Sequence, residues 1–521
     1  MIVTAIKTAG RHVFRALVYG ISGGLIVLLV VGVMALNNKP DLKIWHTSHL
    51  DEEFTAGSQV DSFDEYLELE NRLFDQLQKQ VYAQIEPVDR RAINRYYSGS
   101  LSDPQSAPTN WNRSFEQPAE QARIGVVLLH GMSDSPYSMR SIAEKLHDQG
   151  AWVLGLRIPG HGQAPSGLVS VDWQDMRAAV RLAVRHVRDK TGTKPLYIVG
   201  YSNGGALAVQ YALDSLGDAT LPALDGLVLL SPEIGISKLA AFAAFQERLG
   251  HLLGLQKLAW TDVLPEYDPW KYGSFALNAA KQAHLITAKI QDEITDLGEA
   301  GKLGRMPPIL AFQSVVDATV TAPALVNNLF NRLPAGDVQA HASGAGSHEL
   351  VLFDINRFAR MEPMMNQNPS SWIQPMLADL HRTFTLTLLT NQDNQTKELA
   401  VVMLAPGAAT GELCDMDVTW PPSVYSLSHV ALPFPPDDPY YGANPADSNP
   451  VHHLGELAPR GERDVLLISA ANMLRLRWNP FHEYMMQRIV AFVGLGENPY
   501  DSCYKSNAPS MNVPSTTPIG E

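Results

Sequence analysis

The chain has 521 residues, a formal net charge of -14 and a hydrophobic fraction of 45%. Its length suits either one large α/β domain with insertions or two domains. The acidic charge balance, and a sequence without any basic cluster that interleaves aromatic residues, exclude nucleic acid as an expected partner.

An uncharged stretch near the N-terminus, residues 16–36, is long enough to cross a bilayer as a helix. Three basic residues precede it, so the positive-inside rule places the N-terminus in the cytoplasm. We therefore expect residues 1–40 to form a signal-anchor in the inner (cytoplasmic) membrane, with the rest of the chain on the periplasmic or extracytoplasmic side. A signal peptide that is cleaved near Val33-Met34-Ala35 is the alternative.

Residues 41–123 are predicted to link this anchor to the main domain. Within them, residues 63–77 carry apolar side chains at three- and four-residue spacing, which is typical of an amphipathic helix. The polar run 98–112, which contains Pro and Ser, is predicted to be a loop.

From residue 124 to 497, apolar strand-like runs alternate with helix-like segments. Strands are predicted at 124–130, 151–158, 196–199, 224–230, 308–316 and 349–355, and helices at 138–149 and 173–190. Continuous apolar runs are typical of strands that are buried on both faces. The alternation predicts an α/β fold with a mainly parallel, doubly wound sheet, whose functional groups lie at the carboxyl ends of strands.

Two insertions interrupt this alternation. Residues 236–305 are rich in helix formers and are predicted to be a lid over the site, with a purely structural insertion as the alternative. Residues 356–424 form a second insertion, which includes the strand-like run 384–389. The Ser-, Pro- and Asn-rich residues 498–521 are predicted to be a disordered tail.

The sequence contains two cysteines, Cys414 and Cys503. They could pair in an oxidising space beyond a membrane, because such compartments allow disulfides to persist. Their distance from each other does not follow from the sequence. A disulfide and two unrelated thiols therefore both remain open.

A β-branched run leads into Gly200-Tyr201-Ser202-Asn203-Gly204, and an alanine-rich, helix-prone segment follows. Strand, sharp turn and helix are the context that a G-x-S-x-G nucleophile elbow requires. Glycines permit the strained turn, and the start of the helix favours negative charge at the serine. Ser202 is therefore the candidate nucleophile.

A serine hydroxyl is a weak nucleophile unless a base takes its proton, so Ser202 predicts an acid and then a histidine downstream. Asp317 follows a predicted strand and would orient that histidine. A loop carboxylate that caps the next helix is the alternative. The backbone N–H groups of Asn203 and of Met132, in the loop after the first strand, are the candidate donors of an oxyanion hole.

Two histidines compete for the role of base. His348 directly precedes the predicted strand 349–355, which would put it at the amino end of that strand and across the sheet from Ser202. His429 follows that strand and is preferred. His452-His453 resembles a metal-binding pair, but no second ligand cluster with suitable spacing is found in the sequence, so no metal or cofactor is expected.

Four motifs, in this order, resemble the α/β-hydrolase superfamily, specifically its lysophospholipase, monoacylglycerol lipase and carboxylesterase branch. The resemblance covers residues 124–333 and implies Ser202 as nucleophile, Asp317 as triad acid and acyl transfer from esters. The segment around His348 is similar to a lipase histidine loop, and that around His429 to the histidine loop of bacterial esterases. The motifs lie at residues 128–137, 157–162 with Asp172-Trp173, 200–204 and 317–320.

We therefore expect a serine hydrolase that cleaves carboxylic esters, such as lysophospholipids or monoacylglycerols, through an acyl-enzyme and without a cofactor. The alternatives are a peptidase or amidase that uses the same Ser202, His429 and Asp317, and a non-catalytic binding module of the cell envelope with a hydrolase fold.

Overall fold

The computed structural model describes residues 39–235, 256–335, 348–443, 453–455 and 469–500, together with residues 15, 17–24 and 27. Most of the predicted anchor, the first part of the predicted lid and the end of the predicted tail lie outside these ranges.

A mixed sheet with the strand order β1-β3-β2-β4-β5-β8-β9-β10-β11-β12 forms the centre of the described molecule. All neighbours from β3 to β10 are parallel, and β1, β11 and β12 are antiparallel to their neighbours. The predicted α/β fold with a mainly parallel sheet is thus confirmed. The strands are β1 (Phe115–Gln117), β2 (Ile124–Leu129), β3 (Ala151–Leu156), β4 (Leu196–Tyr201), β5 (Gly226–Leu230), β8 (Ile309–Ser314), β9 (Glu349–Phe353), β10 (Thr385–Asn391), β11 (Glu398–Leu404) and β12 (Glu412–Thr419).

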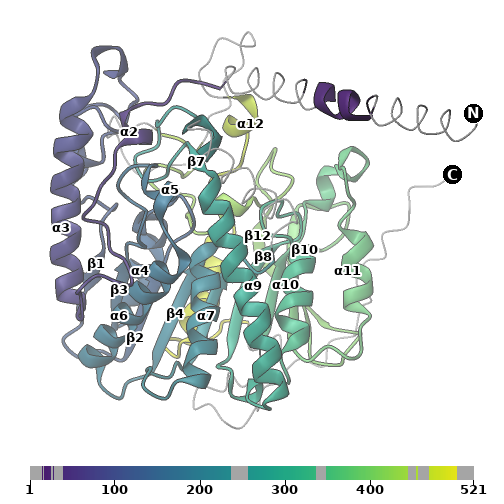
Figure 1. Cartoon of the computed structure of the whole chain (residues 1–521). Helices are drawn as coiled ribbons and strands as arrows, with labels where there is room; N and C mark the ends of the chain where they lie inside the picture. The colour runs from purple at the N-terminus through teal and green to yellow at the C-terminus, as the bar shows by residue number, and fades with distance from the viewer. Residues whose placement is uncertain are drawn as a thin grey trace, which may run out of the picture.

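Helices pack on both faces of the sheet (Figure 1). α6, α7 and α9 share one apolar core with the strands, and α4 and α13 share the core on the other face. Alternate strand residues enter the two cores, as Val127 and Val126 of β2 do, because successive side chains point to opposite faces. The helices are α2 (Ile44–Thr47), α3 (Phe63–Gln80), α4 (Arg140–Asp148), α5 (Gly167–Ser170), α6 (Trp173–Thr191), α7 (Asn203–Gly217), α9 (Leu277–Glu299), α10 (Ala322–Asn328), α11 (Ser370–Leu377), α12 (Ala470–Met473) and α13 (His482–Phe492).

Near the N-terminus, residues 17–24 are helical, and Leu17, Tyr19 and Ile21 are exposed (purple in Figure 1). In the part of the chain that the structure describes, no helix is both long and apolar enough to span a bilayer. The predicted transmembrane helix is therefore not found there.

The segment 41–123, predicted to be a linker, also packs against the main domain. α3 begins at a capping box in which the Ser62 hydroxyl accepts from the Glu65 amide and the Glu65 carboxylate accepts from the Ser62 amide. Its face with Phe63, Tyr66 and Leu69 is buried in the same core as α6 and α7.

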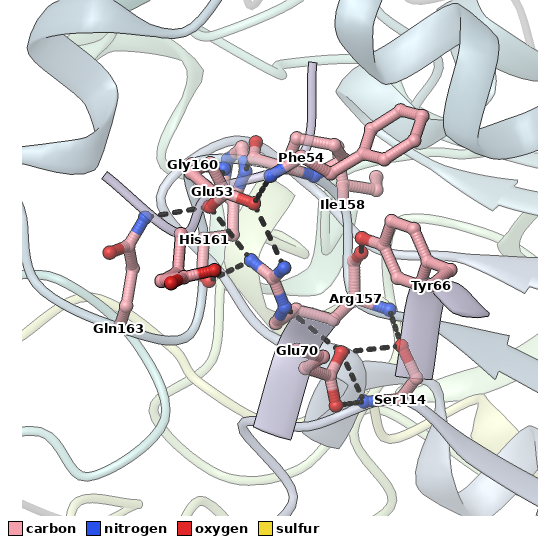
Figure 2. Close-up of polar contacts among 12 residues, drawn as sticks. Glu53, Phe54, Tyr66, Glu70, Ser114, Arg157, Ile158, Gly160, His161 and Gln163 are labelled. Atoms are coloured by element: carbon pink, nitrogen blue, oxygen red, sulfur yellow. Dashed lines mark hydrogen bonds and ion pairs between the residues drawn. The ribbon is translucent and has the colours of Figure 1, made fainter. Parts of the chain in front are cut away.

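A buried charge cluster joins this segment to the loop after β3 (Figure 2). The Arg157 guanidinium donates to Glu70 over 2.9 Å and to Glu53 over 2.9 and 3.0 Å. Glu53 also accepts from the backbone N–H of Gly160 over 2.8 Å and from the Gln163 amide over 2.7 Å. The N-terminal segment thus supplies both carboxylates that neutralise an arginine of the motif at 157–162.

The predicted insertion before the histidine loop adds β10, β11 and β12 to one edge of the sheet. Cys414 of β12 forms a disulfide, and the other cysteine of the sequence, Cys503, lies outside the described ranges. Between β5 and β8, the described part of the other insertion contains α9 and a small hairpin of β6 (Trp260–Asp262) and β7 (Phe275–Ala276).

Candidate active site

Ser202 stands in a strained turn between β4 and α7. Its φ of 53° lies in the left-handed region, which non-glycine residues adopt only where the surrounding structure holds them there. A Cβ on Gly204 would lie 2.2 Å from the carbonyl oxygen of Leu129, and a Cβ on Gly200 would lie 2.4 Å from that of Gly204. Only glycine fits at both positions, so the motif builds the elbow that presents Ser202 at the carboxyl end of β4.

The loop after β2 covers the elbow closely. A Cβ on Gly131 would lie 3.2 Å from the Ser202 Cβ. The next residue, Met132, has a backbone N–H that donates to no acceptor within the described ranges. Asn203 is the first residue of α7, where an N–H has no acceptor in its own helix. The two amides predicted to bind an oxyanion therefore lie on the two loops that meet at Ser202.

Asp317 and His429 are hydrogen-bonded to each other, with 2.8 Å between His429 Nδ1 and Asp317 Oδ2. Both side chains are buried. The other carboxylate oxygen accepts from the amides of Thr319 and Val320 over 2.8 and 2.9 Å, and Gln313 Nε2 also donates to Oδ2 over 3.0 Å. These contacts fix the carboxylate, and they assign the proton to Nδ1, which leaves Nε2 as the acceptor.

Burial alone would raise the pKa of Asp317. The charge and the hydrogen bond of His429, together with the amides of Val320 and Thr319, outweigh burial and hold the pKa of this carboxyl below its ordinary value. Asp317 is thus kept ionised beside the imidazole, as a group that orients a histidine and stabilises its cation must be.

His429 is held beside the elbow. The hydroxyl of Tyr201, the residue before Ser202, donates to the His429 carbonyl over 3.3 Å, and the two rings lie 5.3 Å apart between centroids. The Ser314 hydroxyl at the end of β8 donates to the Leu427 carbonyl over 2.7 Å. The histidine loop is therefore attached to the carboxyl ends of both β4 and β8.

His348 lies elsewhere. It directly precedes β9, and the Thr385 amide at the start of the parallel strand β10 donates to its carbonyl over 2.9 Å. This is the amino edge of the parallel strands, opposite to the edge that carries Ser202. The structure therefore brings His429, and not His348, to Asp317.

Two further histidines near the elbow are bound locally. His130 Nδ1 lies 2.9 Å from the Gly131 carbonyl, and the Ile158 amide donates to its Nε2 over 3.1 Å. Burial lowers the pKa of His130 well below its usual value and that of His161 to about 4. Among the described residues, no group of three His, Cys, Asp or Glu side chains could hold a metal ion.

A cavity of about 280 Å³ adjoins the site. Its lining includes Ser133, which follows Met132, and Val430, which follows His429. Lys271, from the loop between β6 and β7, and Arg475, which follows α12, also line it. A larger cavity of about 440 Å³ between α10 and α11 contains none of the predicted site residues.

Sequence reasoning missed Lys271, Arg475 and Glu233. The backbone amide of Glu233 donates to the Ser202 carbonyl over 2.9 Å. Burial raises the pKa of the Glu233 carboxyl to about 7. No motif marks these three residues, which come from separate parts of the chain. Glu233 could have been noticed in the sequence only because it comes shortly after the strand β5. Nothing in the sequence indicates that Lys271 and Arg475 lie at the same cavity.

Comparison with known proteins gives partial matches. Residues 120–356 match a family model described as serine aminopeptidase, S33; this range includes Ser202 and Asp317 but ends before His429. A thermostable monoacylglycerol lipase of Bacillus sp. (strain H-257) is 28% identical over 123 residues, which are 24% of this chain and 46% of that protein. The chain thus matches less than half of the length of this curated relative.

Solved structures of lipolytic enzymes are also similar over about half of the chain. A structure reported for the metagenome-derived lipolytic enzymes LipS and LipT has 23% identity and a TM-score of 0.35, over 46% of this chain and 87% of that chain. A soluble variant of monoglyceride lipase from Saccharomyces cerevisiae has 15% identity and a TM-score of 0.34, over 46% and 82%. The family match confirms the resemblance predicted from the motifs: residues 120–356 are similar to the serine aminopeptidase S33 family.

Proposed function

We propose that this chain is a serine hydrolase that cleaves carboxylic esters. The observation that carries the proposal is the buried Asp317–His429 pair, with 2.8 Å between Oδ2 and Nδ1, held beside the strained elbow of Ser202. An acid, a base and a nucleophile on three loops at the carboxyl edge of one sheet are what acyl transfer through a covalent intermediate requires.

In this mechanism the Ser202 oxygen attacks the acyl carbonyl while His429 Nε2 takes the hydroxyl proton. The amides of Met132 and Asn203 donate to the oxyanion that forms. His429 then returns the proton to the leaving alcohol, which departs from the acyl-enzyme. Water attacks the acyl-enzyme in the same way, His429 again acts as base and then acid, and the carboxylic acid leaves Ser202 free.

The proposed substrates are lipid esters with one acyl chain, such as monoacylglycerols or lysophospholipids. This proposal is supported by the curated relative named as a monoacylglycerol lipase, which is similar to part of this chain. We further propose that residues 1–40 anchor the protein to the inner membrane with the hydrolase domain on its outer side. The exposed apolar side chains of residues 17–24 and the disulfide of Cys414 support this arrangement, because disulfides persist in oxidising compartments.

The test is a comparison of Ser202→Ala with Ser215→Ala. Ser215 lies on the same helix, α7, and its hydroxyl donates to the Ala212 carbonyl within that helix. With p-nitrophenyl butyrate, we expect Ser202→Ala to lower kcat by a factor on the order of ten thousand or more. Ser215→Ala should retain activity and labelling by a fluorophosphonate probe. Undiminished ester hydrolysis or labelling in Ser202→Ala would show that the nucleophile is another residue.

Amide hydrolysis on the same triad is the second candidate, because the matching family model is described as a serine aminopeptidase. Side-by-side kinetics on an acyl ester and on the matching p-nitroanilide separate the two activities. We expect a higher kcat/KM for the ester. A higher value for the anilide would favour the peptidase, and a wild-type protein that forms no fluorophosphonate adduct would favour a binding module.

A further inference from the structure

The cavity of about 280 Å³ adjoins both the histidine loop and the oxyanion loop. Val430, which follows His429, and Ser133, which follows Met132, both line it. Because the histidine must give its proton to the leaving alcohol, a cavity beside the histidine loop suits the alcohol part of the ester. The volume is just below the usual range of about 300–1,000 Å³ for ligand sites, which suits a small head group better than a long acyl chain.

Two cations, Lys271 and Arg475, line this cavity. No carboxylate within the described ranges lies at ion-pair distance from the partly buried Lys271 or from Arg475. Arg475 makes one side-chain contact to the site, from its Nη2 to the Thr319 hydroxyl over 3.3 Å, and Thr319 belongs to the loop of Asp317. Burial lowers the pKa of Lys271, and the attraction of Asp134 opposes this only in part. An anion bound beside a partly buried lysine stabilises its charged form.

The carboxylates near the cavity are bound by other groups, lie beyond ion-pair distance of the two cations, or are exposed. Asp268 accepts from the Tyr441 hydroxyl over 2.5 Å, and it lies 3.7 Å from Arg477, whose charge it offsets. Burial raises the pKa of Asp134 to about 6, so this carboxyl holds its charge less readily than an ordinary aspartate, and it lies beyond ion-pair distance of Lys271. Asp262, which also lines the cavity, is exposed and screened by solvent. The charges of Lys271 and Arg475 therefore remain available in a chain whose net charge is -14.

We propose that this cavity binds a carboxylate or phosphate on the alcohol part of the ester substrate, and that Lys271 and Arg475 are its binding residues. The inference rests on the proposed ester hydrolase activity and narrows its substrates to anionic esters. A charged group held here also places the scissile carbonyl between Ser202 and the amides of Met132 and Asn203, so that binding of the head group favours reaction as well as affinity.

The experiment uses three esters with the same acyl chain: octanoylglycerol, octanoylglycerol phosphate and octanoylglycerate. The first is neutral, the second carries a phosphate and the third a carboxylate. Release of octanoic acid by the full-length protein gives kcat/KM for each. We expect the wild type to prefer at least one anionic ester over the neutral one by about tenfold or more, which is the effect of one charge-assisted contact.

The variants are Lys271→Met, Arg475→Gln and, as a matched control, Lys302→Met. Lys302 is exposed and lies after α9, at a position that lines none of the cavities described above. Lys271→Met and Arg475→Gln should each lower the ratio of kcat/KM on the anionic ester to that on the neutral ester by about tenfold. Lys302→Met should leave this ratio unchanged. Arg475 is exposed, so its variant tests the proposal even where Lys271→Met fails to fold.

Each outcome decides the inference. Loss of the anionic preference in both variants supports it, and the preferred ester then tells whether a phosphate or a carboxylate is bound. A wild type that hydrolyses the neutral ester at least as well as both anionic ones overturns the inference while the proposed hydrolase activity stands. Equal loss on all three esters also overturns it, because that pattern indicates a structural role. A wild type that hydrolyses none of the three overturns the proposed function together with the inference.

Discussion

The backbone N–H of Asn356 donates to the carbonyl of Tyr425 over 2.8 Å, and this bond joins the two ends of the excursion that contains β10, β11 and β12. When the two ends of an insertion lie side by side, the insertion does not displace the chain that precedes and follows it. The chain therefore leaves β9, builds three further strands and returns to the end of β8 before it reaches His429. This explains how His429 contacts Asp317 across 112 positions of sequence.

The first prediction separates the two histidines. His429→Ala removes the only imidazole bonded to Asp317 among the described residues, and we expect kcat on an ester to fall by a factor on the order of ten thousand. His348→Ala should change kcat by no more than a few-fold, because His348 lies at the amino edge of the sheet. Since His348 is buried, its variant is compared at a temperature where circular dichroism shows it folded. An equal loss in both variants would contradict this assignment.

Much of the sheet could be predicted because its strands are buried on both faces. β2, β4 and β5 are continuous runs of mainly apolar residues, and the elbow lies between a strand and a helix in the sequence itself. The position of His348 before a strand was enough to argue against it as the catalytic base. The first residue of a parallel strand lies at the amino edge of the sheet, opposite to the edge that carries the site.

The rest depends on contacts between distant residues. β11 and β12 were missed, since they are antiparallel strands at the edge of the sheet, and β12 carries polar side chains that a sequence pattern does not distinguish from a loop. The pairing of Arg157 with Glu53 and Glu70 joins residues that are 104 and 87 positions apart. No local pattern predicts it, so the segment 41–123 resembled a linker.

The second prediction concerns two glycines of α7. A Cβ at Gly204 would lie 2.2 Å from the Leu129 carbonyl oxygen and 2.6 Å from that of His130, so Gly204→Ala must displace the backbone of the oxyanion loop. We expect it to destabilise the protein by about 1–3 kcal/mol and to slow fluorophosphonate labelling. Gly217→Ala, at the open end of the same helix, meets nothing within 4 Å and should stabilise by about 0.5 kcal/mol. Urea unfolding measures both, and normal labelling of Gly204→Ala would refute the close approach.

The third prediction concerns the cluster in Figure 2. Arg157→Met leaves Glu53 and Glu70 without their buried cation, and removal of one partner of such a group costs about 3–5 kcal/mol. Arg72→Met is the control: the ion pair of Arg72 with Glu52 is exposed, so its loss should cost less than about 1 kcal/mol. Both variants are compared by urea unfolding. Equal stabilities would mean that the N-terminal segment does not depend on Arg157 for its attachment.

The fourth prediction is a pH dependence of stability caused by Glu233. Burial raises the pKa of this carboxyl to about 7, and its Oε2 has no hydrogen-bond partner in the described part of the chain. A carboxyl with a raised folded-state pKa binds its proton more tightly in the folded protein, so it contributes stability below the unfolded-state pKa that is lost as the pH rises towards 7. Glu233→Gln stays neutral throughout. We therefore expect the melting temperature of the wild type to fall more than that of Glu233→Gln between about pH 5 and pH 8. The same change of melting temperature with pH in both proteins would contradict the prediction. It would show that folding does not shift the ionisation of Glu233, because water or other groups solvate its carboxylate.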